Sequence, residues 1–184
     1  MFSSRIRFIA TGLSFAFVLT ACATPAWLPL RHKESSRLLS TGEQATLHFF
    51  TRDAEFNTGL HLQAGASYQL NIKLLSHWID GTIARNEHAA RLDEKGFANS
   101  VMPAQWMGWL RRSRTHNWFE LMLVQPKCES GSLKGISDIA FDEASGSYNF
   151  VATCDGNLSL YVNDTHGFYS NNAGYASIAV SRVN

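Results

Sequence analysis

Residues 158–180, LSLYVNDTHGFYSNNAGYASIAV, combine two alternating segments with a polar loop between them. From Leu158 to Val162 every second residue is aliphatic, and from Ala176 to Val180 the aliphatic residues again recur at every second position. Side chains alternate between the two faces of a strand, so this period predicts two half-buried strands. The intervening loop is rich in Asn, Asp and Gly, which are typical of tight turns. We therefore expect a strand, a loop and a strand.

Short segments with the same character recur from Ala45 onward. The expected strands are Ala45–Thr51, Leu60–Gln63, Tyr68–Leu75, Trp118–Val124, Ile136–Phe141, Tyr148–Thr153, Leu158–Val162 and Tyr175–Val183. Turn sequences such as Asp80-Gly81 and Asp155-Gly156 separate them. Regular short strands with such turns are typical of an all-β fold, an antiparallel β-sandwich or jelly roll. Ala84–Glu94 is the one short helical candidate.

Composition and length set the domain organisation. The chain has 184 residues, of which 45% are apolar and 17% charged, as in a folded domain. The net charge of +1 gives no reason to expect nucleic acid as a partner. Residues 1–21 have a positive start and a short apolar stretch, which predicts a secretion signal. We expect a linker at 22–42, rich in Ser, Pro and charges, and one domain at 43–184.

The signal ends in Leu19-Thr20-Ala21-Cys22, which resembles the lipobox of bacterial lipoproteins. In that family the cysteine becomes the first mature residue and carries acyl chains such as palmitate, which hold the protein on a membrane. The resemblance implies a lipid-anchored protein of the bacterial cell envelope. Because Ala23 follows rather than Asp, it also implies the outer membrane. The alternative is an ordinary signal peptide that is cut nearby.

Two further cysteines remain, Cys128 and Cys154. In an oxidising compartment such a pair is expected to form a disulfide. The bridge would stabilise the fold by about 3 kcal/mol in the chain-entropy model. A catalytic thiol is the weaker alternative, because neither cysteine has an obvious local base.

The polar loop offers oxygen atoms from Asp164, Asn171 and Asn172. Carboxylate, amide and backbone oxygens are the ligands that Ca²⁺ prefers. The same residue types also form ordinary turns in which side chains bond only their own backbone. Composition alone leaves both interpretations open.

The run YVNDTHGFYSNNAGYASIAV resembles the calcium loop of the bacterial galactophilic lectin, a small calcium-dependent β-sandwich, and of the related galactose-binding-like domains. The resemblance implies that Asp164, Asn171 and Asn172 bind Ca²⁺ through their side chains and Phe168 through its backbone oxygen. It also implies a further carbonyl ligand near Ser76–Trp78. A glycan or small carbohydrate is then the expected partner.

In that family the bound sugar is contacted by the calcium loop and by a second loop. The resemblance therefore implies that Asp164, Asn171 and Asn172 also contact a sugar, and His88 is the counterpart of a residue in the second loop. The segment LRRSRTHNWFELM is also similar to a strand entry of galactose-binding-like domains. This similarity implies a structural role for Trp118 and Phe119.

The stretch 86–117 is the least strand-like part of the domain, so we expect a long excursion from the sandwich. It contains Trp106 and Trp109, followed by Arg111, Arg112, Arg114 and His116. We expect the two tryptophans to cap the core and the arginines to be solvated. The alternative is a ligand surface, because aromatic rings stack on sugars and guanidinium groups bond hydroxyls.

The sequence lacks the G-x-S-x-G, H-E-x-x-H and Gly-rich phosphate-loop patterns, so we predict no catalytic residue. Asp138, Asp142 and Glu143 are the carboxylates that a glycoside hydrolase could use, but their spacing in space is not fixed by sequence. The function we predict is calcium-dependent carbohydrate binding by a lipid-anchored envelope protein. The alternatives are an adaptor lipoprotein that binds an envelope protein, with calcium only bracing the loop, and an accessory hydrolase.

Overall fold

The computed structural model describes residues 36–184, apart from the side chains of residues 129 and 130. The predicted signal peptide, Cys22 and the linker up to residue 35 lie outside the described residues. Within the described part, no helix is long and apolar enough to span a membrane.

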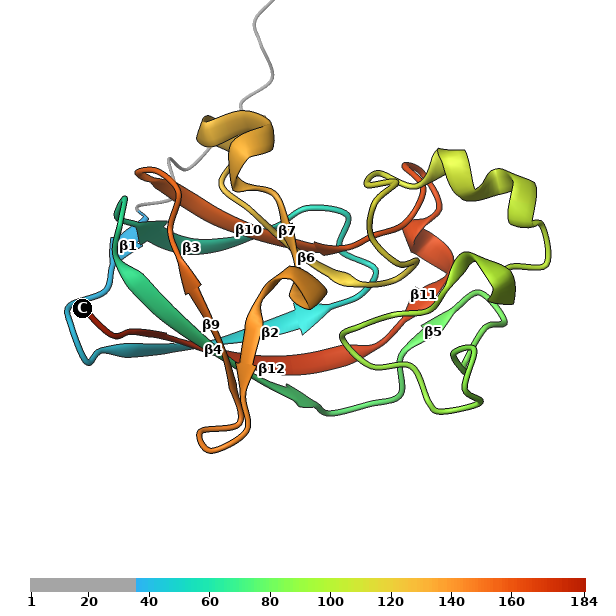
Figure 1. Cartoon of the computed structure of the whole chain (residues 1–184), viewed down its shortest axis with the longest axis horizontal. Coiled ribbons are helices and arrows are strands. Elements are labelled where there is room, and N and C mark those ends of the chain that lie inside the picture. The colour runs from blue at the N-terminus through green and yellow to red at the C-terminus, as the bar shows by residue number, and fades with distance from the viewer. Residues whose placement is uncertain (1–35) are drawn as a thin grey trace, which may run out of the picture. The chain divides into compact units, whose positions relative to one another are not determined.

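Two five-stranded sheets form the domain (Figure 1). The first sheet has the order β1 (Arg37–Leu38), β3 (Phe56–Leu62), β10 (Gly156–Val162), β6 (Leu121–Val124) and β7 (Lys134–Gly135). The second sheet has the order β2 (Gln44–Phe50), β12 (Tyr175–Arg182), β4 (Ser67–Leu74), β9 (Ser147–Val151) and β8 (Ala140–Asp142). All neighbouring strands are antiparallel except β1 and β3, so the predicted antiparallel β-sandwich is confirmed.

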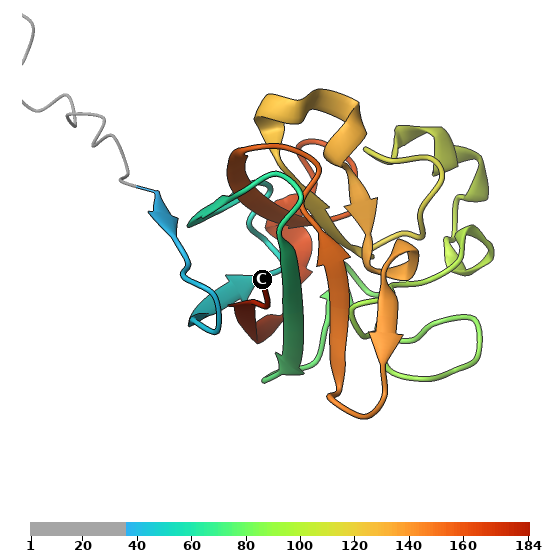
Figure 2. The same cartoon turned by 60° about the vertical axis from the view of Figure 1, so that its left-hand side comes forward.

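One apolar core lies between the sheets. Phe49 of β2 and Ile178 of β12 are fully buried, as are Leu62 and Leu160 from the opposite sheet. The neighbouring strands β4, β9 and β8 run side by side over this core in Figure 2. Leu39, in the segment predicted as linker, is also fully buried beside β1. The domain therefore includes residues directly before the first long strand.

Shorter elements complete the fold. A two-stranded ladder pairs β5 (Ile79–Asp80) with β11 (Asn172–Ala173). The 3₁₀ helices are η1 (Asn99–Val101), η2 (Gln105–Leu110), η3 (Pro126–Ser132), η4 (Ile136–Asp138) and η5 (Tyr169–Asn171). As expected, residues 86–117 form no regular strand; they hold η1, η2 and isolated bridges.

Three local predictions were wrong. The helix expected at Ala84–Glu94 is a hairpin, closed by bridges between Arg85 and Arg91 and between Trp78 and Leu92. The strand expected at Ile136–Phe141 begins instead as η4 and becomes β8 only at Ala140. Strand β10 is buried on both faces rather than one, because the guanidinium of Arg112 lies 3.5 Å from the ring centroid of Tyr161 on its outer face.

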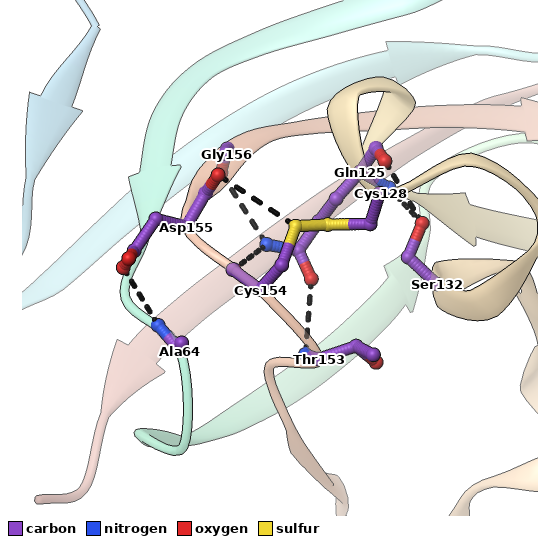
Figure 3. Close-up of a disulfide and its surroundings, with 8 residues drawn as sticks. All are labelled: Ala64, Gln125, Cys128, Ser132, Thr153, Cys154, Asp155 and Gly156. Atoms are coloured by element: carbon purple, nitrogen blue, oxygen red, sulfur yellow. Dashed lines mark hydrogen bonds between the residues drawn. A yellow bond between two sulfur atoms is a disulfide. The ribbon is translucent and has the colours of Figure 1, made fainter.

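Cys128 and Cys154 form the predicted disulfide, which links η3 to the turn before β10, with 6.1 Å between their Cα atoms (Figure 3). Gln125 lies beside the bridge, where its side-chain amide donates to the carbonyl of Cys154 and its Oε1 accepts from the Thr153 amide. Ser132 accepts from the Gln125 amide and donates to the Gln125 carbonyl. These bonds satisfy the side-chain and backbone polar groups of the buried Gln125, which lies next to the disulfide and holds the turn that carries Cys154.

Candidate cation-binding site

The β5–β11 ladder brings together two parts of the chain that are far apart in sequence. Asp80 pairs with Asn172 and Ile79 with Ala173 in antiparallel register. The ladder lies at one end of the sandwich, away from β1 and the C-terminus (Figure 1). The loop from Asn163 to Asn171 enters it from β10. A polar segment after β4 and the Asn-rich loop therefore meet at one sandwich end.

Asp164 is the predicted carboxylate of this loop, and it is 3% exposed. Its Oδ1 accepts the backbone N–H of Thr165 at 2.6 Å, and its Oδ2 accepts the Nδ2–H of Asn172 at 2.9 Å. These two donors act to lower the pKa of Asp164, but burial outweighs them and raises it. The two hydrogen bonds therefore compensate only part of the cost of burying the Asp164 carboxylate.

Asp80 is a second buried carboxylate, although its sequence context, Asp80-Gly81, predicted only a turn. It is 8% exposed. Burial and, as the smaller cause, the negative charge of nearby Asp164 together raise its pKa to about 7. Within the described residues, no cationic group is among the causes of either shift. Two acidic groups therefore share a poorly solvated site without an opposite charge.

Unpaired polar atoms gather at the same place. Within the described part of the chain, three buried side-chain atoms lack a hydrogen-bond partner: Thr51 Oγ1, Trp78 Nε1 and Asn172 Oδ1. A Cβ built on Gly174 would lie 2.6 Å from Trp78 Cδ1 and 2.9 Å from Thr51 Oγ1, so these groups surround this glycine. Asn172 Nδ2 donates to the Thr51 carbonyl at 3.3 Å. Buried unpaired polar groups are uncommon in folded proteins, and of these three Asn172 Oδ1 and Thr51 Oγ1 are oxygens that can accept a partner.

The other two predicted ligands, Phe168 and Asn171, lie at the start and the end of η5. A Cβ on Gly81 would lie 3.1 Å from Asn171 Nδ2, so the Asn171 amide lies over the Asp80-Gly81 turn. The Phe168 carbonyl accepts the backbone N–H of Asn171 at 3.2 Å, which leaves its second lone pair for another partner. The structure thus brings Asp164, Asn171 and Asn172 together and adds Asp80 to them.

Asn163, which precedes Asp164, fixes the start of the loop. It is fully buried, and its Oδ1 accepts the Ser113 amide at 2.8 Å. Its Nδ2 donates to the carbonyls of Ser113 and Asn117, each at 2.8 Å. The loop is fixed further because Tyr169 donates its hydroxyl proton to the Val162 carbonyl at 2.7 Å. The loop backbone is therefore held by contacts that do not use the Asp164 side chain.

This donor set could hold a hard divalent cation. It offers two carboxylates, an unpaired amide oxygen, a second amide and a backbone carbonyl, all of them oxygen donors that suit Ca²⁺. Residues 36–184 contain no group of three or more His, Cys, Asp and Glu side chains with metal-binding geometry. A cation here would depend on amide and carbonyl oxygens as much as on Asp80 and Asp164. Asp80 could have been suspected from its place directly after Ser76–Trp78, where a further ligand was expected.

His88, the predicted sugar contact, lies on the turn of the Arg85–Arg91 hairpin. Its backbone N–H donates to Asn86 Oδ1, and its exposed ring is 3.7 Å from the Glu87 carboxylate. The contacts made by His88 are thus with its own turn rather than with the Asp164 loop.

The expectations for both tryptophans and for Arg111 and Arg112 were wrong, whereas Arg114 is exposed as expected. Trp106 and Trp109 are 73% and 57% exposed on η2, so they do not cap the core. Arg111 is not solvated either, because its guanidinium donates to the carbonyls of Gly108, Arg114 and His116. Arg112 donates to the Ala54 carbonyl and lies near the rings of Tyr161 and Tyr169. The structural role expected for Trp118 and Phe119 is confirmed, since both are buried in the core.

A row of Ser113, His116 and Asp138 bears on the hydrolase alternative. Ser113 Oγ is 2.5 Å from His116 Nδ1, and His116 Nε2 is 2.7 Å from Asp138 Oδ2. Ser113 is buried, however, and its hydroxyl also lies 3.2 Å from Thr115 Oγ1. The Gly135 amide donates to Asp138 Oδ2 at 2.9 Å. A nucleophile must be reachable by substrate, and Ser113 is buried, so the row is a structural link between two turns whose Asp138 end is exposed.

Similarity to known proteins was found in structure but not in sequence. No protein-family model and no curated protein match the sequence. A solved structure described as "EclA N-terminal domain; PllA-like lectin" is similar with a TM-score of 0.47 and 18% sequence identity, over 74% of this chain and 94% of that chain. What this chain binds is therefore inferred from its own residues.

Proposed function

We propose that this chain is a calcium-dependent carbohydrate-binding β-sandwich. The observation that carries the proposal is the buried pair Asp80 and Asp164 beside the unpaired Oδ1 of Asn172. Two buried carboxylates without a counter-charge are costly, and a bound divalent cation removes that cost. Asp164, Asn171, Asn172, the Phe168 carbonyl and Asp80 would hold the ion.

The carbohydrate part of the proposal follows from where the ion would lie. Asn171 is exposed and Phe168 has an exposed ring, so one side of the site faces solvent. Ca²⁺ takes six to eight oxygen ligands, and the five protein groups supply five when each binds through one oxygen. Vicinal sugar hydroxyls can complete such a shell. Asp164, Asn171 and Asn172 would then contact both ion and sugar.

Calcium-dependent thermal unfolding tests the cation. The purified chain is compared in calcium and in chelator, alongside Asp164→Asn. Calcium at 100 times its dissociation constant should stabilise the native state by about 2.7 kcal/mol. Asp142→Asn is the matched control, because this exposed carboxylate bonds only its own turn residues Ala144 and Ser145. An equal calcium response in both variants would place the ion elsewhere.

A glycan array tests the ligand. Calcium-loaded protein should bind a defined set of glycans and lose them in chelator, while Asp164→Asn should bind none. Calcium binding without any glycan binding would instead support the adaptor function, in which calcium only braces the loop.

The proposed location is the bacterial cell envelope, through acylated Cys22, at the outer membrane. The support is the lipobox-like sequence before Cys22. Cells labelled with a clickable palmitate analogue should yield a labelled protein, and Cys22→Ser should abolish the label. An unlabelled wild-type protein would point to ordinary signal cleavage.

A further inference from the structure

A cleft of about 420 Å³ lies directly beside the candidate cation site. Asn172 lines this cleft, and its neighbours Ala173 and Gly174 continue the wall. The volume lies within the range of small-molecule sites, about 300–1,000 Å³. The cleft is therefore continuous with the candidate site through Asn172.

Aromatic rings form one wall of the cleft. Phe50 of β2 is 44% exposed and stacks on Tyr175 of β12, with 4.7 Å between ring centroids and 22° between planes. Tyr175 in turn stacks on His48 at 5.8 Å, and its hydroxyl lies 2.7 Å from His48 Nδ1. These contacts fix the rings on adjacent strands, so a flat apolar surface is held ready before a ligand arrives.

Free charged groups form the rim. Arg52 and Asp53 both line the cleft. Within the described residues, the side chains of Arg52 and Asp53 have no hydrogen-bond or ion-pair partner. A guanidinium donates and a carboxylate accepts, so together they can bond hydroxyl groups of either polarity. Their charges balance, which favours a neutral polar ligand over an ionic one.

A sugar ring has the matching chemistry. One face of a hexose is largely C–H and packs on an aromatic ring, while its edge carries hydroxyls. A lipid tail would leave the rim groups Arg52 and Asp53 unused. The position beside Asn172 means that a sugar at the cation and a sugar in the cleft would be neighbours.

We propose that this cleft is a second sugar subsite, which binds a neutral hexose residue adjoining the one held at the cation. The hexose stacks on Phe50 and Tyr175 and bonds Arg52 and Asp53 through its hydroxyls. This inference rests on the proposed function, and it makes the ligand an oligosaccharide of at least two residues.

Calorimetric titration with sugars of two lengths tests the subsite. The probes are galactose and two disaccharides in which galactose is linked to a second neutral hexose, lactose and melibiose, in the presence of calcium. One disaccharide should bind about tenfold more tightly than galactose, because a stacked ring contributes on this scale. Phe50→Ala should remove this gain and leave galactose and calcium affinity unchanged.

Phe141→Ala is the matched control. Phe141 lies on β8 of the same sheet, is 48% exposed and contacts Tyr148 at a ring-centroid distance of 4.8 Å, so its removal mimics the loss of an exposed aromatic contact. Equal weakening of disaccharide binding in the Phe50 and Phe141 variants would overturn the subsite. Arg52→Ala is the second variant, which leaves the aromatic wall intact and should also reduce the gain.

The two proposals fail in different ways. If galactose binds with calcium but neither disaccharide binds more tightly, the second subsite is refuted while the proposed function stands. If no array glycan and none of the three probe sugars binds the calcium-loaded protein, the proposed function is refuted and the subsite with it.

Discussion

Without a bound cation, the protein should lose stability as the pH rises from 5 to 8. Asp80 is responsible, because burial and the charge of Asp164 raise its pKa from 3.8 to about 7 in the folded state. A raised folded pKa means that the folded protein holds the proton more tightly than the unfolded chain does. Its contribution to stability is therefore complete below pH 3.8 and is lost as the pH rises towards 7.

The size of the loss follows from proton linkage. For one carboxyl with these two pKa values, the free energy of unfolding falls by roughly 2–3 kcal/mol between pH 5 and pH 8. A change of this size corresponds to roughly 5–10 °C in Tm for a domain of this length. Asp164 acts in the same direction, since burial raises its pKa as well.

Thermal unfolding in chelator, followed by circular dichroism at several pH values, measures the effect. Asp80→Asn should flatten the profile and be more stable than the wild type at pH 8, because the amide carries no charge. Asp142→Asn should keep the wild-type loss, since Asp142 is exposed and its pKa is lowered by its bond to Ser145. Calcium should restore wild-type stability at pH 8. A flat wild-type profile in chelator would refute the cost of burying Asp80 beside Asp164, on which the proposed cation site is built.

Three further changes test the scaffold around the site. Asn163→Ala should lower the free energy of unfolding by about 2–4 kcal/mol in urea denaturation, because it leaves buried backbone groups of the 113–117 turn unpaired; a loss below 1 kcal/mol would contradict this role. Replacing Cys128 and Cys154 by Ala should lower the free energy of unfolding by about 3 kcal/mol without changing calcium affinity, since the bridge lies on η3 away from the loop. Weaker calcium binding by calorimetry would show instead that the disulfide also supports the cation site. Gly174→Ala should destabilise the fold and also weaken calcium binding, because the added Cβ would lie 2.6 Å from Trp78. If calorimetry finds normal calcium affinity for this variant, Gly174 does not shape the cation site.

The strand pattern was predictable because the side-chain period of a strand depends on local geometry alone. Five of the eight expected segments match a strand within two residues at each end. Strand β3 begins four residues before Leu60, β6 begins three residues after Trp118, and Ile136–Phe141 contains β8 only at its end. The two-residue period reports that side chains alternate, but it does not report which faces other elements cover. This is why β10 was expected to be half-buried, although Arg112 covers Tyr161 on its outer face.

The excursion was harder to interpret, because long loops are placed by tertiary contacts rather than by periodicity. The apolar character of Trp106 and Trp109 favoured the core, but η2 holds both on the surface. Arg111 and Arg112, which follow, donate hydrogen bonds to backbone carbonyls of nearby turns. Nothing in a local sequence window distinguishes these outcomes.

Residue types at short spacing were enough to predict the all-β class and the Asn-rich loop with Asp164. The pairing of Cys128 with Cys154 was predictable for another reason, since they are the two cysteines that remain besides Cys22. Only the tertiary structure brought Asp80 beside Asp164, through the pairing of β5 with β11. Only the tertiary structure, again, set Phe50 against Tyr175 to line the adjoining cleft. The physical reason is that burial and charge repulsion arise between segments that meet in space, and the pairing of distant strands is decided by the assembly of the whole sandwich.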